Sequence, residues 1–260
     1  MLLVSAILVS TATYAWFSMN RTVTATGMKV QATSSQSLVI ANTIGSTGVG
    51  TETTVTFTTA TRTLIPATYD ASAEYTTHLK YVTNPGSVSA GTGLQAGSTA
   101  LVYADAINDE TEHKYYYIDY VVYIASSGGE LTNQKLNAVL TQTTSLDTDT
   151  IKATSVDFYV NRNSTSLGTY AGTLNVAGLN RSTNDGTTAL TSVDLLSYTG
   201  ATRVIPENKS TSTYLQITMR VYFDGALLKT ASPAQAYVYS DNVDTTEVGF
   251  KVDFTAQENT

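Results

Sequence analysis

The stretch YYYIDYVVYIA, from Tyr115 to Ala125, decides the fold class, because its residues alternate with the period of two that belongs to a β-strand. One face of this predicted strand carries Tyr116, Ile118, Tyr120, Val122 and Ile124, and the other carries Tyr115, Tyr117, Asp119, Val121 and Tyr123. A half-buried β-strand needs one such apolar face. The stretch therefore predicts a central strand of an all-β protein.

Two later stretches, Tyr214–Phe223 (YLQITMRVYF) and Val248–Phe254 (VGFKVDF), alternate in the same way and predict two more central strands. We expect one shared core to bury Ile217, Met219, Val221, Phe250 and Val252. Weaker patterns predict companion strands at Thr53–Thr59, Lys135–Thr143 and Ser155–Val160.

Clusters of Gly, Ser, Asn and Asp separate the predicted strands, as in a β-sandwich or barrel. Low-complexity segments predict loops at Asn42–Thr51, Asn84–Ser98 and Leu179–Thr188. Helix signals are sparse, and the best candidate is Thr188–Gly200, where Gly200 stands as a C-terminal stop.

The composition suits an exported protein better than a nucleic-acid-binding one. Charged residues make up 13% of the 260 residues, about half the usual ~25%. The net charge is −7, and the 14 Lys and Arg residues are scattered, whereas phosphate binding needs clustered basic residues. The chain has no cysteine, so disulfides and thiolate metal sites are excluded.

The chain begins with an uncharged apolar segment, Leu2–Ala15, followed by Trp16 and Phe17. Its length fits the h-region of a signal peptide and is short for a membrane span. Thr13 and Ala15 stand at the −3 and −1 positions of a small-x-small cleavage pattern, which predicts a cut between Ala15 and Trp16. The alternative is a retained apolar helix that packs in a filament core, as in type IV pilins.

The sequence offers little support for catalysis or metal binding. His78 and His113 lie in different neighbourhoods, and neither has a second His or a Glu at metalloprotease spacing nearby. The acidic stretches Leu146–Thr150 and Asp241–Glu247 lack the full ligand spacing of a calcium loop, so we expect solvated turns. We therefore predict no enzyme activity, no catalytic or metal site and no cofactor.

The N-terminus, TATYAWFSMNRTVTATGMKVQA over Thr11–Ala32, resembles the TasA/camelysin group of exported fibre proteins, which has relatives among archaeal bundling pili. The finish, over Tyr214–Gly225 and Ser240–Phe254, resembles a clostridial-type subset that shares the TYAWF start. The segment between these ends matches only the general β pattern.

The resemblance implies an antiparallel jelly-roll-like β-sandwich that polymerises by donating a strand to the next subunit. The implied donor is Trp16–Ala32, and its apolar anchors are Trp16, Phe17, Val23, Met28 and Val30. Donation satisfies the ladder of an edge strand and covers apolar pockets. The alternation slips phase between Ala25 and Met28, so Gly27 is a candidate bulge or bend. A strand that pairs only within its own subunit is the alternative.

Together these patterns predict three parts: a signal-like segment over residues 1–15, a donor strand over 16–32 and one β-sandwich domain over 33–260. The predicted function is that of a secreted structural subunit of an extracellular filament or biofilm matrix fibre. Its partners are copies of itself, and it contacts the membrane only transiently, during export through residues 1–15. The alternatives are a pilin-like subunit that keeps its apolar helix and a monomeric surface-binding module.

Overall fold

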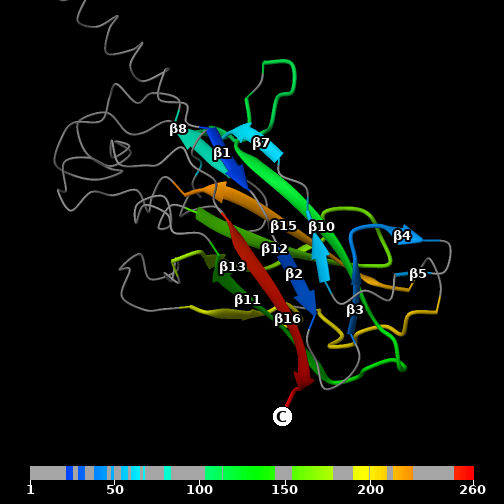
Figure 1. The fold of residues 1–260 in the computed structure, drawn as a ribbon. Coiled ribbons are helices and arrows are strands. Elements are labelled where there is room, and N and C mark those ends of the chain that lie inside the picture. The colour runs from blue at the N-terminus through cyan, green and yellow to red at the C-terminus, as the bar shows by residue number, and fades with distance from the viewer. Residues whose placement is uncertain are drawn as a thin grey trace, which may run out of the picture.

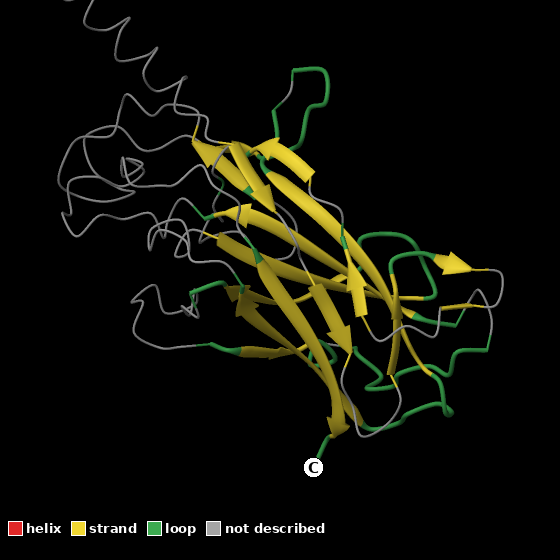
Figure 2. Cartoon of the chain, in the orientation of Figure 1, coloured by secondary structure: helices red, strands yellow, loops and turns green. Residues whose placement is uncertain are grey.

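The computed structural model of the chain describes residues 22–25, 29–32, 38–45, 48–49, 54–57, 60–64, 67, 79–82, 103–112, 114–143, 154–177, 190–198, 200–209, 213–224 and 249–260. Within these residues all regular structure is β-strand, and no helix occurs (Figure 2). The predicted all-β class is confirmed for this part of the chain.

Two five-stranded sheets make up most of the described structure (Figure 1). The β10 sheet has the strand order β13-β12-β15-β10-β3, and the β16 sheet has the order β14-β11-β16-β2-β6. Three two-stranded pairs, β1-β7, β4-β5 and β8-β9, accompany them. The strands are β1 (Thr22–Ala25), β2 (Lys29–Ala32), β3 (Leu38–Ala41), β4 (Ile44–Gly45), β5 (Gly48–Val49), β6 (Thr54–Thr56), β7 (Ala60–Thr63), β8 (Lys80–Val82), β9 (Tyr103–Asp105), β10 (Tyr117–Ser126), β11 (Gln134–Gln142), β12 (Thr154–Arg162), β13 (Thr169–Asn175), β14 (Ser192–Asp194), β15 (Leu215–Phe223) and β16 (Phe250–Glu258).

The three stretches with the strongest alternation form β10, β15 and β16, and each has a strand on both sides. The prediction that they are central strands is therefore confirmed. The companion strands are also found, as β6, β11 and β12. A central strand buries one whole face and pairs along both edges, which is why its alternation is the clearest in the sequence.

One hydrophobic core lies between the two sheets and holds all five residues predicted to share it: Ile217, Met219, Val221, Phe250 and Val252. Each of them is at most 2% exposed. The same core takes residues from β3, β10 and β12 of one sheet and from β6, β11 and β16 of the other. The described part is thus a β-sandwich-like arrangement of two sheets with their apolar faces turned inward.

Pairing within the two large sheets is antiparallel except at one place. β2 runs parallel to β16 and antiparallel to β6, so an N-terminal strand lies between the C-terminal strand and β6. A parallel neighbour cannot be joined by a tight hairpin, because its connection must cross over. Here the two paired strands come from opposite ends of the chain.

Two local predictions are wrong or incomplete. The sequence predicts a helix over Thr188–Gly200, but its residues Ser192–Asp194 form β14, which pairs with β11. The carboxylate of Asp194 accepts hydrogen bonds from the backbone N–H groups of Leu136 and Leu196, and these bonds favour a strand followed by a turn. The predicted loop Asn42–Thr51 contains the short pair β4-β5.

Several other predictions lie outside the described residues. They concern the segment 1–15, His78, His113, and the loops and acidic stretches at 84–98, 146–150, 179–188 and 241–247.

Candidate assembly site

The predicted donor segment forms two strands in two different sheets. β1 pairs with β7, and β2 fills the position between β16 and β6. Figure 1 shows β1 beside β7, and β2 beside β16, where it pairs with the first half of that strand. The structure holds a single chain, and in it both strands pair within that chain. The phase slip around Gly27 thus coincides with a change of sheet.

Val30 has a register partner on each side of β2. Its neighbours in register are Val252 on β16 and Val55 on β6, and those two side chains are 0% and 3% exposed. Residues directly opposite each other in neighbouring strands share a face of the sheet. β2 therefore lies between two strands whose valines at this register position, Val55 and Val252, belong to the main core.

The opposite face of β16 is polar beside β2. Lys251 and Asp253 form an ion pair of 2.7 Å between Nζ and Oδ1. In register they lie beside Lys29 and Gln31 of β2. The polar residues of β2 thus hold the register positions beside the polar residues of β16.

Val23 lies in β1, where its register partner is Arg62 of β7. The four pairs of this antiparallel ladder are Thr22 with Thr63, Val23 with Arg62, Thr24 with Thr61 and Ala25 with Ala60. The remaining predicted anchors Trp16, Phe17 and Met28, like the predicted cleavage site at Ala15, lie outside the described residues. The structure therefore places Val23 and Val30 in two separate ladders and does not bring them together.

The sequence did not predict β7, the strand that pairs with β1. It predicted β6 and β16 as strands but not that β2 lies between them. β7, with the sequence ATRT, is not predicted, because four residues with one apolar position give too short an alternation to detect. Val55 and Val252 lie in predicted strands, but no periodicity within one strand indicates which other strand lies beside it.

A second cluster of interest lies on the outer face of the β10 sheet, around Arg220. Its Nε and Nη2 donate to Oδ1 and Oδ2 of Asp119, both at 2.8 Å, and its guanidinium carbon lies 3.7 Å from the ring centre of Tyr117. Burial lowers the pKa of Arg220, but the hydrogen bonds and charge of Asp119 outweigh that effect and hold the pKa above its ordinary value. This planar, bidentate arrangement holds β10 and β15 together.

A buried polar row continues from this cluster across the same sheet. Oδ1 of Asp157 accepts hydrogen bonds from Oγ1 of Thr173 at 2.6 Å and from the Tyr222 hydroxyl at 3.2 Å. Burial raises the pKa of the neighbouring Tyr159, and the negative charge of Asp157 raises it further. The two hydrogen bonds satisfy Oδ1 of Asp157 between strands, and the raised pKa of Tyr159 favours its protonated form.

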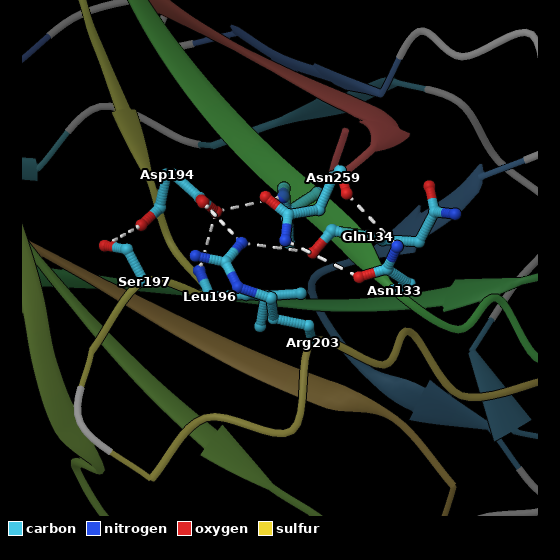
Figure 3. A network of polar contacts seen from close by, with 8 residues as sticks. Asn133, Gln134, Asp194, Leu196, Ser197, Arg203 and Asn259 are labelled. Atoms are coloured by element: carbon cyan, nitrogen blue, oxygen red, sulfur yellow. Dashed lines mark hydrogen bonds and ion pairs between the residues drawn. The ribbon is translucent and has the colours of Figure 1, made fainter.

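A separate network of polar contacts lies at one end of the β16 sheet (Figure 3). Nη1 of Arg203 lies 2.7 Å from Oδ2 of Asp194, and the Gln134 N–H donates to the Arg203 carbonyl. Asn259 is held by Asn133, whose backbone carbonyl accepts the Asn259 N–H at 2.8 Å and whose side-chain amide donates to the Asn259 carbonyl at 3.1 Å. These bonds attach a loop and the end of β16 to the start of β11.

The chemistry of the described residues is that of strand pairing and cross-strand polar contacts. Within the described part of the chain, no group of three or more His, Cys, Asp and Glu residues is placed to hold a metal ion. No described helix is long and apolar enough to cross a membrane.

No protein-family model matches this chain, and no curated protein or solved structure matches it.

Proposed function

We propose that the protein is a secreted structural subunit of an extracellular filament or biofilm matrix fibre, and that subunits join by donation of the N-terminal strand segment. The observation that carries this proposal is that the N-terminal segment forms two strands, β1 and β2, whose partners β7, β16 and β6 all come from other parts of the chain. An N-terminal strand fills a position between β16 and β6, in register with the buried Val252 and Val55. A strand pairing that a terminal segment makes within its own chain can also form with the same segment of a neighbouring copy.

The proposed subunit begins at Trp16, after a cut behind Ala15, and the remainder forms one jelly-roll-like sandwich domain over residues 33–260. Residues 1–15 serve export only. No cofactor takes part, and the partners are further copies of the chain. These features rest on the resemblance of the N-terminus to exported fibre proteins and on the all-β sandwich-like fold.

Strand exchange is energetically feasible because each strand pairing that opens within one chain forms again between two chains. The register pairs of β1 and β2 correspond to on the order of ten ladder hydrogen bonds, each contributing ~0.5–1.5 kcal/mol. Fully buried apolar anchors add ~1.5–3 kcal/mol each, and ordering the segment costs ~1–2 kcal/mol per residue. Since the free energy gained from the ladder hydrogen bonds nearly equals the cost of ordering the backbone, burial of the apolar anchors decides whether the segment binds.

The test uses protein exported by cells and examined by electron microscopy. We expect fibres whose N-terminal residue, read by Edman degradation, is Trp16. A synthetic peptide of residues 16–32 in excess should shorten the fibres, because it occupies the acceptor position of growing ends. A peptide of the same composition in scrambled order is the control.

Three results would contradict the proposal. Fibres that begin at Met1 would favour the pilin-like alternative, in which the apolar helix stays in the filament core. Fibres that grow unchanged in the presence of the peptide would exclude strand donation. Exported protein that remains monomeric at all concentrations would favour a monomeric surface-binding module.

A further inference from the structure

We infer that β1 alone is the exchanged strand, that it pairs with β7 of a second copy of the chain, and that β2 stays in its own sheet. This inference rests on the proposed function and divides the segment 16–32 into a donor part and a part of the sandwich. It also names the acceptor, the edge of β7 over Ala60–Thr63.

β2 is built into its sheet on both sides. It pairs with β16 over four residues and with β6 over three, and Val30 stands between the buried Val252 and Val55. Removal of β2 would separate β6 from β16, whose residues Val55 and Val252 belong to the main core. A strand in this position is part of the sandwich itself.

Among the described strands, β1, unlike β2, pairs along one edge and not along both. In the described part of the chain β7 is the only strand with which it pairs, and the two form a sheet of their own. An isolated pair of strands is at best marginally stable in water. β1 and β7 are also distant in the sequence, so no tight turn keeps them together. β1 is therefore the element of the N-terminal segment that separates most easily.

The acceptor β7, by contrast, is anchored to the sandwich at its end. Leu64, the next residue, is 3% exposed, belongs to the main core and bridges to Tyr115. Further on, the Ala67 N–H donates to the Phe223 carbonyl of β15 at 3.0 Å. β7 thus stays with the body of its subunit when β1 leaves.

The pairing of β1 with β7 within the chain shows that the two strands can form an antiparallel ladder. The same four register pairs form whether β1 comes from the same chain or from a neighbour. Because the donor and the acceptor are different surfaces, the contact is head-to-tail, and repeated contacts of this kind give an open filament when the rotation between subunits does not close a ring. The break between Ala25 and Lys29, which contains Gly27, separates the donor from β2.

The cysteine-free chain allows a direct test by disulfide cross-linking. Full-length chains with Thr24→Cys and chains with Thr61→Cys are co-expressed, and the exported fibres are oxidised and run on a non-reducing gel. Directly paired residues in neighbouring strands lie within the distance that a disulfide spans. The control pair is Gln31→Cys with Asp253→Cys, which are register partners in β2 and β16.

The expected result is a disulfide-linked dimer band from Thr24→Cys mixed with Thr61→Cys, and at least tenfold less from Gln31→Cys mixed with Asp253→Cys. The double variant Gln31→Cys/Asp253→Cys should instead form its disulfide within one chain. If only the β2–β16 mixture gives dimers, the inference is wrong, whereas strand donation stands. If fibres form and neither mixture gives dimers, both the inference and strand donation are wrong. If no fibres form, the proposed function fails, and the inference fails with it.

Discussion

Replacing Phe250 with alanine removes a fully buried aromatic ring from the main core. Phe250 is 0% exposed and begins β16, where it pairs in register with Gln142 of β11. Loss of a fully buried phenylalanine costs ~3–5 kcal/mol, because the apolar transfer energy is lost and a cavity remains. A domain of this size loses about 2–4 °C of melting temperature per kcal/mol, so the expected decrease is roughly 6–20 °C.

The assay is urea unfolding of soluble, monomeric subunits, followed by circular dichroism, with a thermal scan in parallel. The matched control is Ile107→Ala, since Ile107 is 65% exposed and its loss should change the free energy of unfolding by no more than about 0.5 kcal/mol. A melting temperature of the Phe250→Ala protein within the error of the wild type would refute the assignment of β16 to the core. An equal loss in both variants would show that the effect does not come from burial.

Three further substitutions test other parts of the structure. Gly168→Ala should cost about 1–3 kcal/mol, because Gly168 has a φ of +90° and a Cβ atom there would lie 2.4 Å from a backbone carbonyl oxygen of β12; Gly128→Ala, which has open space, should have little effect, and equal stability of the two variants would contradict the backbone conformation at Gly168. In a double-mutant cycle of Asp119→Ala and Arg220→Met followed by urea unfolding, the two side chains should couple by roughly 0.5–3 kcal/mol, and strict additivity would show that their bidentate contact adds nothing. Because burial raises the pKa of Tyr159 above 10.0, the unfolded chain releases this proton first; stability should therefore be complete below pH 10 and fall above it, and Tyr159→Phe should reduce that fall, whereas an unchanged pH profile would argue against the buried position.

The strands β16 and β14 differ in how far their own sequences predict them. The alternation of Phe250, Val252 and Phe254 against Lys251 and Asp253 is a local property, so β16 and its buried face are predicted from the sequence. β14 has three residues and lies in a segment whose pattern favours a helix. Its structure depends on pairing with β11 and on a hydrogen bond that the Asp194 carboxylate accepts from the N–H of Leu136, which is far away in the sequence, and no local pattern contains that information.

The candidate assembly site was predicted only in part, for the same reason. The β character around Val23 and Val30 follows from their own neighbours in the sequence, as does the break near Gly27. That Val30 lies between Val55 and Val252 depends on which strands meet in space.

By itself the sequence determined the all-β class, the central strands and the residues that face the core, because an alternation of period two depends only on consecutive side chains. Only the tertiary structure decided which strands are neighbours, that β2 runs parallel to β16, and that β1 pairs with β7 in a separate sheet. The physical reason is that backbone hydrogen bonds between strands are the same for every sequence, so the choice of partner is made by the packing of side chains from distant parts of the chain.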